Sequence, residues 1–326
     1  MAVIRIGTFN VENLFFRYVK RDKELISGRG VSEDKLVTLS FDRVIEDSSV
    51  VGKASRELTA RVILENDPDI LAVQEVENLE VLDRFSRDFL KKRYPYSMCI
   101  DGNDPRLIDV GLLSKHPLGA VRTDRFHPPR SGVRRRTFSR DCLDVEVLLP
   151  GAAGSRVRVL VNHFKSRIVR DGDDGTARRM TQAKRVRELV REALNDTPYV
   201  VVAGDLNAAP HDPELRPLLR GLGLENVLDR LPKEARWTHY FKRAKAPRLP
   251  NEQLDYLLMS PALSAAAVGE PIVERRGLPP DIVKRVNAAA EALGGAIRPF
   301  RRPDKPDASG FNEASDHCAI FVDVDI

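Results

Sequence analysis

The sequence predicts an α/β fold in which buried β-strands end in polar side chains. Several apolar runs rich in β-branched residues, such as residues 200–203, stop abruptly at a carboxylate or an imidazole. Segments with apolar residues at helical spacing separate some of these runs. Between residues 96 and 148, by contrast, strand-like runs follow one another with turns and few helical signals between them, which indicates antiparallel sheet.

The chain of 326 residues is long for one domain, but a large two-sheet architecture can hold it as a single unit. No internal repeat, low-complexity tract or break in composition marks a domain boundary. We therefore expect one domain over residues 1–326 that carries two insertions. Residues 20–53 are rich in charge, Gly and Ser without periodicity, and residues 276–312 combine a helix around 281–293 with a polar loop.

The composition excludes several classes of protein. The chain is 42% hydrophobic and 31% charged, with no apolar run long enough to cross a bilayer and no export signal at its start. Its three cysteines are an odd number and widely spread, unlike a disulfide scaffold or a zinc cluster. We expect a cytoplasmic protein without stable membrane association, and nothing in the sequence indicates a protein partner.

Two strands in the first part of the chain are predicted to end in possible ligands. Residues 3–9 alternate apolar side chains with small or polar ones and then reach Asn10 and Glu12. The strand predicted over residues 70–75 begins with an apolar run and ends in the same way, at Glu75. Because carboxylate and amide oxygens bind metal ions and carboxylates also move protons, these strand ends are candidate functional positions.

Two later strands repeat this pattern. The alternating run 156–162 ends at His163, close to Lys165, and the run that begins at residue 200 ends in Asp205 and Asn207. Asp205 and Asn207 lie two residues apart and therefore point to the same side of a strand, and the glycine before them lets a backbone or a ligand come close. Taken alone, these residues also fit an ordinary polar turn and a structural histidine.

The remaining elements follow from periodicity and turn residues. Helical spacing of apolar residues predicts three helices, over residues 55–66, 78–93 and 177–194. Further strands are predicted over residues 96–100, 109–114, 118–126, 137–148, 253–259 and 319–324. Asp255 lies near the beginning of one strand, and Asp316 and His317 come just before the last. The aromatic segment 237–241 favours core packing over a rim that holds a sugar or base.

Positive charge is unevenly distributed. The formal net charge is +5, yet residues 115–140 contain eight Lys or Arg against one acidic residue, Asp124, for a local charge of +7. A polyanionic substrate such as nucleic acid would be attracted to this segment, and salt would weaken the attraction. The alternative is a solvated, arginine-rich loop.

The candidate residues share one property, because each lies at a strand end or in the turn beside one. They are Asn10, Glu75, His163, Asp205, Asn207, Asp255, Asp316 and His317. Side chains in such places can converge on one rim of packed sheets. Their carboxylate and amide oxygens suit a hard cation such as Mg²⁺ or Mn²⁺, whereas zinc is disfavoured because no Cys/His cluster has its spacing.

Six motifs around these residues resemble, in type and in order, those of the endonuclease/exonuclease/phosphatase superfamily. They are Thr8-Phe9-Asn10-Val11-Glu12-Asn13-Leu14, Gln74-Glu75-Val76-Glu77-Asn78, Asn162-His163-Phe164-Lys165-Ser166, Gly204-Asp205-Leu206-Asn207, Leu254-Asp255-Tyr256 and Ser315-Asp316-His317. The resemblance spans residues 8–317 and is nearest to bacterial nuclease-like members, many of which are exported. It implies a DNase I-like four-layer α/β sandwich, in which two mainly antiparallel or mixed sheets pack face to face with helices outside.

The resemblance also implies divalent-metal-dependent hydrolysis of phosphoesters and a role for each residue. Asp205 and Asn207 would orient or activate the attacking water and contact the phosphate. His317, supported by Asp255, would be a general base or a transition-state stabiliser, while His163 would bind phosphate or help the leaving oxygen. Metal binding is assigned to Asn10, Glu75 and Asp316, and substrate binding to Arg140 and Lys165. A metal and cations are needed because a phosphodiester repels hydroxide.

The substrate class is predicted from smaller differences. Abasic-site endonucleases of the superfamily usually have a phosphate-contacting tyrosine where this chain has Leu107, which argues against that activity. Together with the basic segment, this favours a nuclease acting on nucleic acid. A phosphomonoesterase or a phospholipase-type hydrolase is the alternative and would need a narrow pocket or an apolar rim. A non-catalytic binding protein is disfavoured because none of the required acids, amides and imidazoles is missing.

Overall fold

The computed structural model describes residues 3–15, 53–128, 136–150, 155–169, 174–240, 251–287, 296–302 and 313–326, with the backbone of residues 18–19 and 25–26. The predicted insertion at 20–53 therefore lies almost entirely outside the described residues. Within the insertion predicted at 276–312, the structure has a helix, α7 (Pro280–Asn287), where the sequence predicts one. The continuation of that helix to residue 293 lies outside the described residues.

Twelve strands form two mixed sheets. The first sheet has the order β13 (Ala267–Glu274), β14 (Ala319–Asp325), β1 (Val3–Leu14), β4 (Ile70–Val76), β6 (Asp109–Ser114) and β5 (Tyr96–Cys99). The second has the order β11 (Glu225–Asn226), β12 (Asp255–Met259), β10 (Val200–Asp205), β9 (Arg156–His163), β8 (Cys142–Leu148) and β7 (Leu118–Thr123). The pairs β1·β4 and β9·β10 are parallel and the other pairs are antiparallel. A separate two-stranded ribbon joins β2 (Tyr18–Val19) and β3 (Leu25–Ile26).

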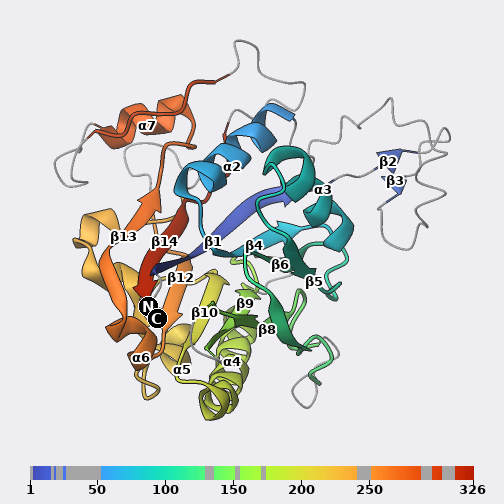
Figure 1. Cartoon of the computed structure of the whole chain (residues 1–326), viewed down its shortest axis with the longest axis vertical. Helices are drawn as coiled ribbons and strands as arrows, with labels where there is room; N and C mark the ends of the chain where they lie inside the picture. Colours follow the sequence, from blue (N-terminus) through green and yellow to red (C-terminus); the bar gives the residue numbers. More distant parts are fainter. Residues whose placement is uncertain are drawn as a thin grey trace.

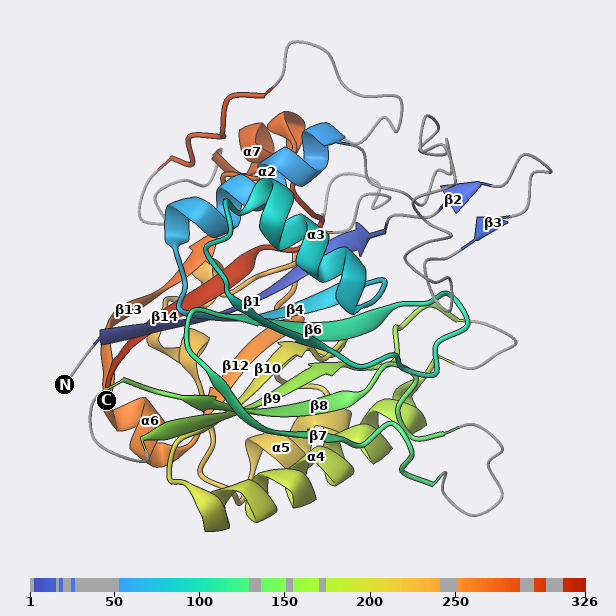
Figure 2. The ribbon, with the colours of Figure 1, turned by 45° about the vertical axis from the view of Figure 1, so that its right-hand side comes forward.

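Helices cover the outer faces of both sheets and complete four layers. In Figure 2, α2 (Lys53–Asn66) and α3 (Leu79–Phe89) lie above the first sheet, whereas α4 (Thr176–Asp196) and α5 (Arg216–Leu219) lie below the second. The short helix α6 (Pro261–Ala265) follows β12 near the end of the sandwich where both termini lie (Figure 1). The four-layer sandwich expected from the motif resemblance is confirmed.

The core follows these layers. One cluster joins the facing sides of the two sheets, with Ile6 and Ile70 from the first sheet and Val159 and Val201 from the second. A second cluster lies between the first sheet and helices α2 and α3, and a third between the second sheet and α4. Central strands are therefore buried on both faces, which explains why β10 is apolar without alternation.

Helix α4 shows how sequence and packing agree. Its apolar residues recur at helical spacing, and Ala183, Val186 and Val190 are fully buried against the second sheet. It connects β9 to β10, and a helix is the usual connection between neighbouring parallel strands. The two strands therefore run in the same direction and end at the same edge. Helix α2 connects β1 to β4 in the same way in the first sheet.

The aromatic segment, the cysteines and the helices can also be compared with the predictions from sequence. Trp237 and Tyr240 are buried in a cluster with α7, so the aromatic segment 237–241 is core over its described part. All three cysteines are buried and free. Among the described helices, none is both long and apolar enough to cross a membrane.

Candidate active site

The candidate site lies at the edge of the sandwich where strands of both sheets end. In the second sheet, Asp205 is in register with His163 on one side and with Asp255 on the other. This follows from topology, because β10 is parallel to β9 but antiparallel to β12, so that two strand ends and one strand start share the edge. From the first sheet, Asn10 reaches across to the same place.

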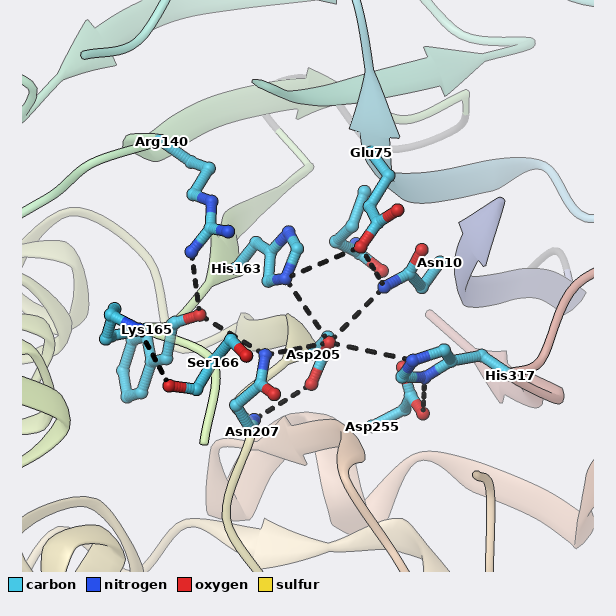
Figure 3. A network of polar contacts seen from close by, with 12 residues as sticks. Asn10, Glu75, Arg140, His163, Lys165, Ser166, Asp205, Asn207, Asp255 and His317 are labelled. Atoms are coloured by element: carbon cyan, nitrogen blue, oxygen red, sulfur yellow. Dashed lines mark hydrogen bonds and ion pairs between the residues drawn. The ribbon is translucent and has the colours of Figure 1, made fainter. Parts of the chain in front are cut away.

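Asp205 is the centre of the site (Figure 3). Its Oδ2 lies 3.3 Å from Asn10 Nδ2, 3.4 Å from His163 Nε2 and 3.8 Å from His317 Nε2. Its Oδ1 accepts a hydrogen bond from the backbone N–H of Asn207 at 2.8 Å. The structure brings these five residues together, while their roles as site residues stay predictions.

Gly204 makes this close arrangement possible. Its φ is +133°, and a Cβ atom placed there would lie 1.9 Å from the backbone oxygen of Asn162 on β9. A side chain would therefore separate β9 from β10 just where His163 and Asp205 meet. The expectation that this glycine allows a close backbone approach is confirmed.

Burial changes the acidity of Asp205. The side chain is almost fully shielded from water, and this desolvation raises the pKa of Asp205 to about 7. The cation of His317 lowers the pKa, and the carboxylates of Asp255 and Glu75 raise it. A carboxyl group that titrates near neutrality can take a proton from water and give it up again at neutral pH.

His317 is held as a cation. Burial lowers its pKa, but the negative charges of Asp255 and Asp205 outweigh burial and raise the pKa of His317 well above its usual range. Its Nδ1 lies 2.8 Å from Asp255 Oδ2, and that oxygen also accepts a hydrogen bond from Thr238 Oγ1 at 2.6 Å. Ser315 Oγ accepts from the backbone N–H of His317 at 3.0 Å. The ring orientation is therefore fixed by side chains from separate elements.

His163 differs from His317 in its charge. Burial, followed by the nearby cation of Arg140, lowers the pKa of His163 well below its usual range. Its imidazole is therefore neutral at physiological pH. Nε2 lies 3.4 Å from Asp205 Oδ2 and 3.9 Å from Glu75 Oε1, so it can donate a hydrogen bond into the centre of the site. The two imidazoles beside Asp205 thus differ in charge.

Glu75 is positioned by an unusual backbone conformation at the end of β4. Its φ is +66°, and its Oε2 accepts a hydrogen bond from the backbone N–H of Asn13 at 3.1 Å. Its Oε1 lies 3.4 Å from Asn10 Nδ2. The side chain is 19% exposed, unlike the almost fully buried Asp205, so solvent and solutes can reach this carboxylate.

The donor set around Glu75 fits a hard divalent cation, because it offers carboxylate and amide oxygens. Asn10 directs its amide nitrogen to Glu75 while its Oδ1 accepts from the backbone N–H of Glu12 at 3.1 Å, so metal binding by Asn10 requires its amide to turn over. Asp316 lies farther along this edge, with one carboxylate oxygen 3.9 Å from His239 Nε2 and the other 3.9 Å from His317 Nε2. Of the three predicted metal ligands, Asn10 and Glu75 are therefore in direct contact.

The two predicted substrate-binding residues differ in position. Arg140 is 2% exposed, and its Nη1 donates to the backbone oxygen of Phe164 at 3.1 Å, an oxygen that also accepts from Asn207 Nδ2 at 3.2 Å. Its Nε lies 3.1 Å from Asp104. Arg140 is thus joined to the site, as Figure 3 shows. Lys165 lies at its side, and its Nζ donates to the backbone oxygen of the next residue at 3.0 Å.

The basic segment predicted over residues 115–140 does not form one surface over its described part. Lys115 pairs with Asp67 and Asp69, at the edge of the sandwich opposite to the candidate site. Arg140, at the other end of the segment, is buried within the site. Residues 129–135 lie outside the described residues. A count of charge along the chain could not show this separation. Lys115 directly follows β6 and Arg140 comes just before β8, and these two strand ends lie at different edges of the sandwich.

Sequence reasoning missed residues that support the site. Thr238 and His239 lie in the segment predicted as core, and their contacts with Asp255 and Asp316 carry no signal in local periodicity. Ser315 is part of a quoted motif but was given no role, although its hydroxyl donates to the backbone oxygen of Asn10 at 2.7 Å.

Comparison with known proteins agrees with this geometry. A sandwich whose two sheets end in acids, imidazoles and amides around one buried carboxylate defines a DNase I-like phosphoester hydrolase. The sequence profile described as "Endonuclease/Exonuclease/phosphatase family" matches residues 7–317. The chain belongs to that family, and the resemblance seen in its motifs is confirmed.

Solved structures share the fold at low sequence identity. TDP2 of D. rerio, complexed with single-strand DNA product, is 15% identical with a TM-score of 0.58 and covers 100% of both chains. The human nocturnin catalytic domain is 16% identical with a TM-score of 0.58, over 98% of this chain and 93% of its own. A beta toxin from Staphylococcus aureus is 16% identical with a TM-score of 0.57, over 98% and 99%. A comparison with curated protein sequences gave no match.

Proposed function

We propose that this protein is a divalent-metal-dependent phosphodiesterase, and specifically a nuclease that hydrolyses phosphodiester bonds of nucleic acid with water. The observation that carries the proposal is the cluster around Asp205. There a carboxyl group with a pKa of about 7 lies between a cationic and a neutral imidazole, beside the partly exposed carboxylate of Glu75. The buried, free cysteines suit a reducing compartment, and we propose a cytoplasmic site of action.

The metal ion belongs on the Glu75 side of the site. Glu75, with Asn10 and Asp316, would hold Mg²⁺ or Mn²⁺, because these oxygen donors suit hard cations. When bound, such an ion neutralises charge on the phosphate and lowers the pKa of water.

Asp205 and its neighbours would then have different roles in the hydrolysis. Asp205, fixed by the backbone N–H of Asn207, accepts the proton of the attacking water. The cationic His317 stabilises the negative charge that develops on the phosphate, which favours this role over that of general base. Neutral His163 donates a hydrogen bond from Nε2, and Arg140 adds positive charge to a site otherwise rich in carboxylates.

An exposed aromatic residue near the site favours nucleic acid as substrate. Phe126 is 61% exposed, with the guanidinium groups of Arg125 and Arg136 at 4.9 and 5.7 Å from its ring centre. Asn103 connects this loop to the irregular segment that leads to Arg140, by hydrogen bonds to the backbone oxygens of Arg125 and Phe138. A ring flanked by cations can stack on a base while the cations contact phosphates.

A second observation favours the alternative, a phospholipase-type hydrolase. Ile168 and Val169 are 61% and 62% exposed, and they follow β9 within a few residues of His163. Large exposed apolar side chains beside an active site can insert into a lipid surface. The catalytic residues would be the same in both cases, so the substrate must be determined by experiment.

The proposal is tested by hydrolysis assays with the purified protein. Plasmid DNA, single-stranded DNA, RNA, inositol phosphates and sphingomyelin vesicles are each incubated with Mg²⁺ or Mn²⁺, with a chelator as control. We expect cleavage of a nucleic acid that requires the cation and weakens steeply with salt. Turnover of the lipid or the inositol phosphates alone would reject the nuclease and support the alternative.

A further inference from the structure

Two histidines that are distant in the sequence face each other beside the catalytic cluster. His239 and His317 form an antiparallel β-bridge, and their ring centres are 4.5 Å apart. Further backbone hydrogen bonds stabilise this bridge. The N–H of Cys318 donates to the backbone oxygen of Thr238 at 2.6 Å, and His239 and Glu252 donate to each other's backbone oxygens. The two imidazoles are therefore held in place by the backbone.

Asp316 completes a set of three donors. One of its carboxylate oxygens lies 3.9 Å from His239 Nε2 and the other lies 3.9 Å from His317 Nε2. One donor atom from each residue fits within 4.8 Å of the others. Around a tetrahedral zinc with bonds of ~2.0–2.1 Å, donor atoms lie ~3.3–3.4 Å apart, so donors within 4.8 Å of one another would have to close by at most ~1.5 Å.

The orientation of His317 matches that of a metal-binding histidine. Its Nδ1 lies 2.8 Å from Asp255, and Thr238 Oγ1 holds the same carboxylate oxygen. In protein metal sites a carboxylate commonly binds one ring nitrogen of a histidine while the other nitrogen binds the metal. His239 and Asp316 have side chains that are 12% and 25% exposed, so an ion can enter from solvent.

We infer that His239, Asp316 and His317 form a binding site for a transition metal of the zinc class, with a fourth position open to water. Two imidazole nitrogens and one carboxylate are a softer donor set than the oxygens around Glu75, so the two sites differ in preference. His239 lies far from Asp316 and His317 in the sequence, which is why spacing within the chain disfavoured zinc.

Occupancy of this site would inhibit hydrolysis. Asp316 and His317 would be withdrawn from the catalytic reaction, and the charge of the His317 imidazolium would be lost on coordination. Zinc would therefore act as an inhibitor in the presence of Mg²⁺. The inhibition rests on the proposed function, whereas binding of the metal does not.

Metal binding is tested by cobalt spectroscopy, which needs no substrate. The full chain, stripped of metal, is titrated with Co²⁺ at pH 8, because protons compete with the metal for imidazole nitrogen and a higher pH weakens that competition. We expect one four-coordinate Co²⁺ per chain, detected by its strong visible absorption, and its displacement by Zn²⁺. His239→Gln should lower zinc affinity more than ~100-fold, since loss of a direct ligand should exceed the 10–100-fold cost of losing an outer partner.

Controls separate ligation from a change in folding. His211→Gln removes an exposed histidine, with a side chain 83% exposed, and should leave the cobalt spectrum unchanged. His239→Cys retains a ligand at the position and should restore binding with an added sulfur-to-metal absorption band. No four-coordinate absorption in the wild type, or the same spectrum in His239→Gln, would overturn the site.

Inhibition is measured as the ratio of rates with and without zinc for each variant. With saturating Mg²⁺, the wild-type rate should fall at least ~10-fold at zinc concentrations that saturate the cobalt-detected site, while the ratio for His239→Gln should stay near one. Equal inhibition of both proteins would overturn the inhibitory role. If no substrate is hydrolysed at all, the proposed function fails, but the cobalt titration still decides whether the metal site exists.

Discussion

Replacement of Asp255 by Asn is the substitution whose effect follows most directly from the geometry. Asp255 is completely buried, and its Oδ2 lies 2.8 Å from His317 Nδ1 and accepts from Thr238. Asn has nearly the same shape but no charge, so the change removes the counter-ion of the His317 imidazolium. The proposed stabilising cation would then be lost at neutral pH.

The expected loss of transition-state stabilisation can be estimated from the energy of a charge-assisted hydrogen bond and from that of an ion pair. A charge-assisted hydrogen bond contributes about 1.5–3 kcal/mol net. The Coulomb energy of two unit charges ~4 Å apart is about 4 kcal/mol at an effective dielectric constant near 20. A loss of roughly 2–4 kcal/mol of transition-state stabilisation corresponds to a fall in kcat of about 30- to 1,000-fold.

The assay is steady-state hydrolysis of the preferred substrate at saturating Mg²⁺, with folding checked by circular dichroism and thermal unfolding. Asp281→Asn is the matched control, because this aspartate on α7 has a side chain 64% exposed and pairs with Arg285 of the same helix. A kcat for Asp255→Asn within about threefold of wild type, in folded protein, would refute the proposed role of the charged pair.

Three further predictions concern acidity and packing. Because burial raises the pKa of Asp205 to about 7 and the proposed base must be ionised, kcat/KM should fall as pH drops below about 7, and a flat profile down to about pH 5 would contradict this role. Gly204→Ala should lower the free energy of unfolding by at least ~3 kcal/mol in denaturant titrations, since its Cβ would meet Asn162 O; an unchanged midpoint would show that β9 and β10 separate easily. Arg158→Leu should cost ~3–5 kcal/mol by leaving buried Asp144 unpaired, and adding Asp144→Leu should recover most of that loss, whereas additive losses would exclude coupling.

Part of the site could be predicted from local pattern alone. The apolar runs before His163 and Asp205 are separated by one amphipathic helix, so the strands should be parallel neighbours with both polar ends at one edge. The same argument applies to Asn10 and Glu75 on either side of α2. These pairs needed no knowledge of the family.

The other half of the site depends on pairings between distant residues. Asp255 meets Asp205 only because β12 is antiparallel to β10, and hydrophobic periodicity does not encode strand direction. The sequence motifs supplied Asp255 and His317 instead. His239 was missed because the burial of its neighbours predicts core, and only the bridge to His317 brings its ring to the site.

An edge strand of the first sheet, β13, was also missed. Strand β13 was not predicted because Gly269, with a φ of +71°, and Pro271 interrupt its apolar run. Its register with β14 shifts between Val268 and Ile272, which is how the irregular segment joins the edge of the sheet. An edge strand tolerates such residues because no strand is hydrogen-bonded to one of its two sides.

The central claim is that the cluster around Asp205 carries out metal-dependent hydrolysis of phosphodiesters. The most direct test is hydrolysis of bis(p-nitrophenyl) phosphate with Mg²⁺ or Mn²⁺ by the wild type and by Asp205→Asn, which removes the charge and keeps the shape. We predict turnover by the wild type that a chelator abolishes, and a loss of more than about 1,000-fold in the variant at an unchanged fold. Equal rates for the two proteins would contradict the assignment of Asp205 as the centre of the site.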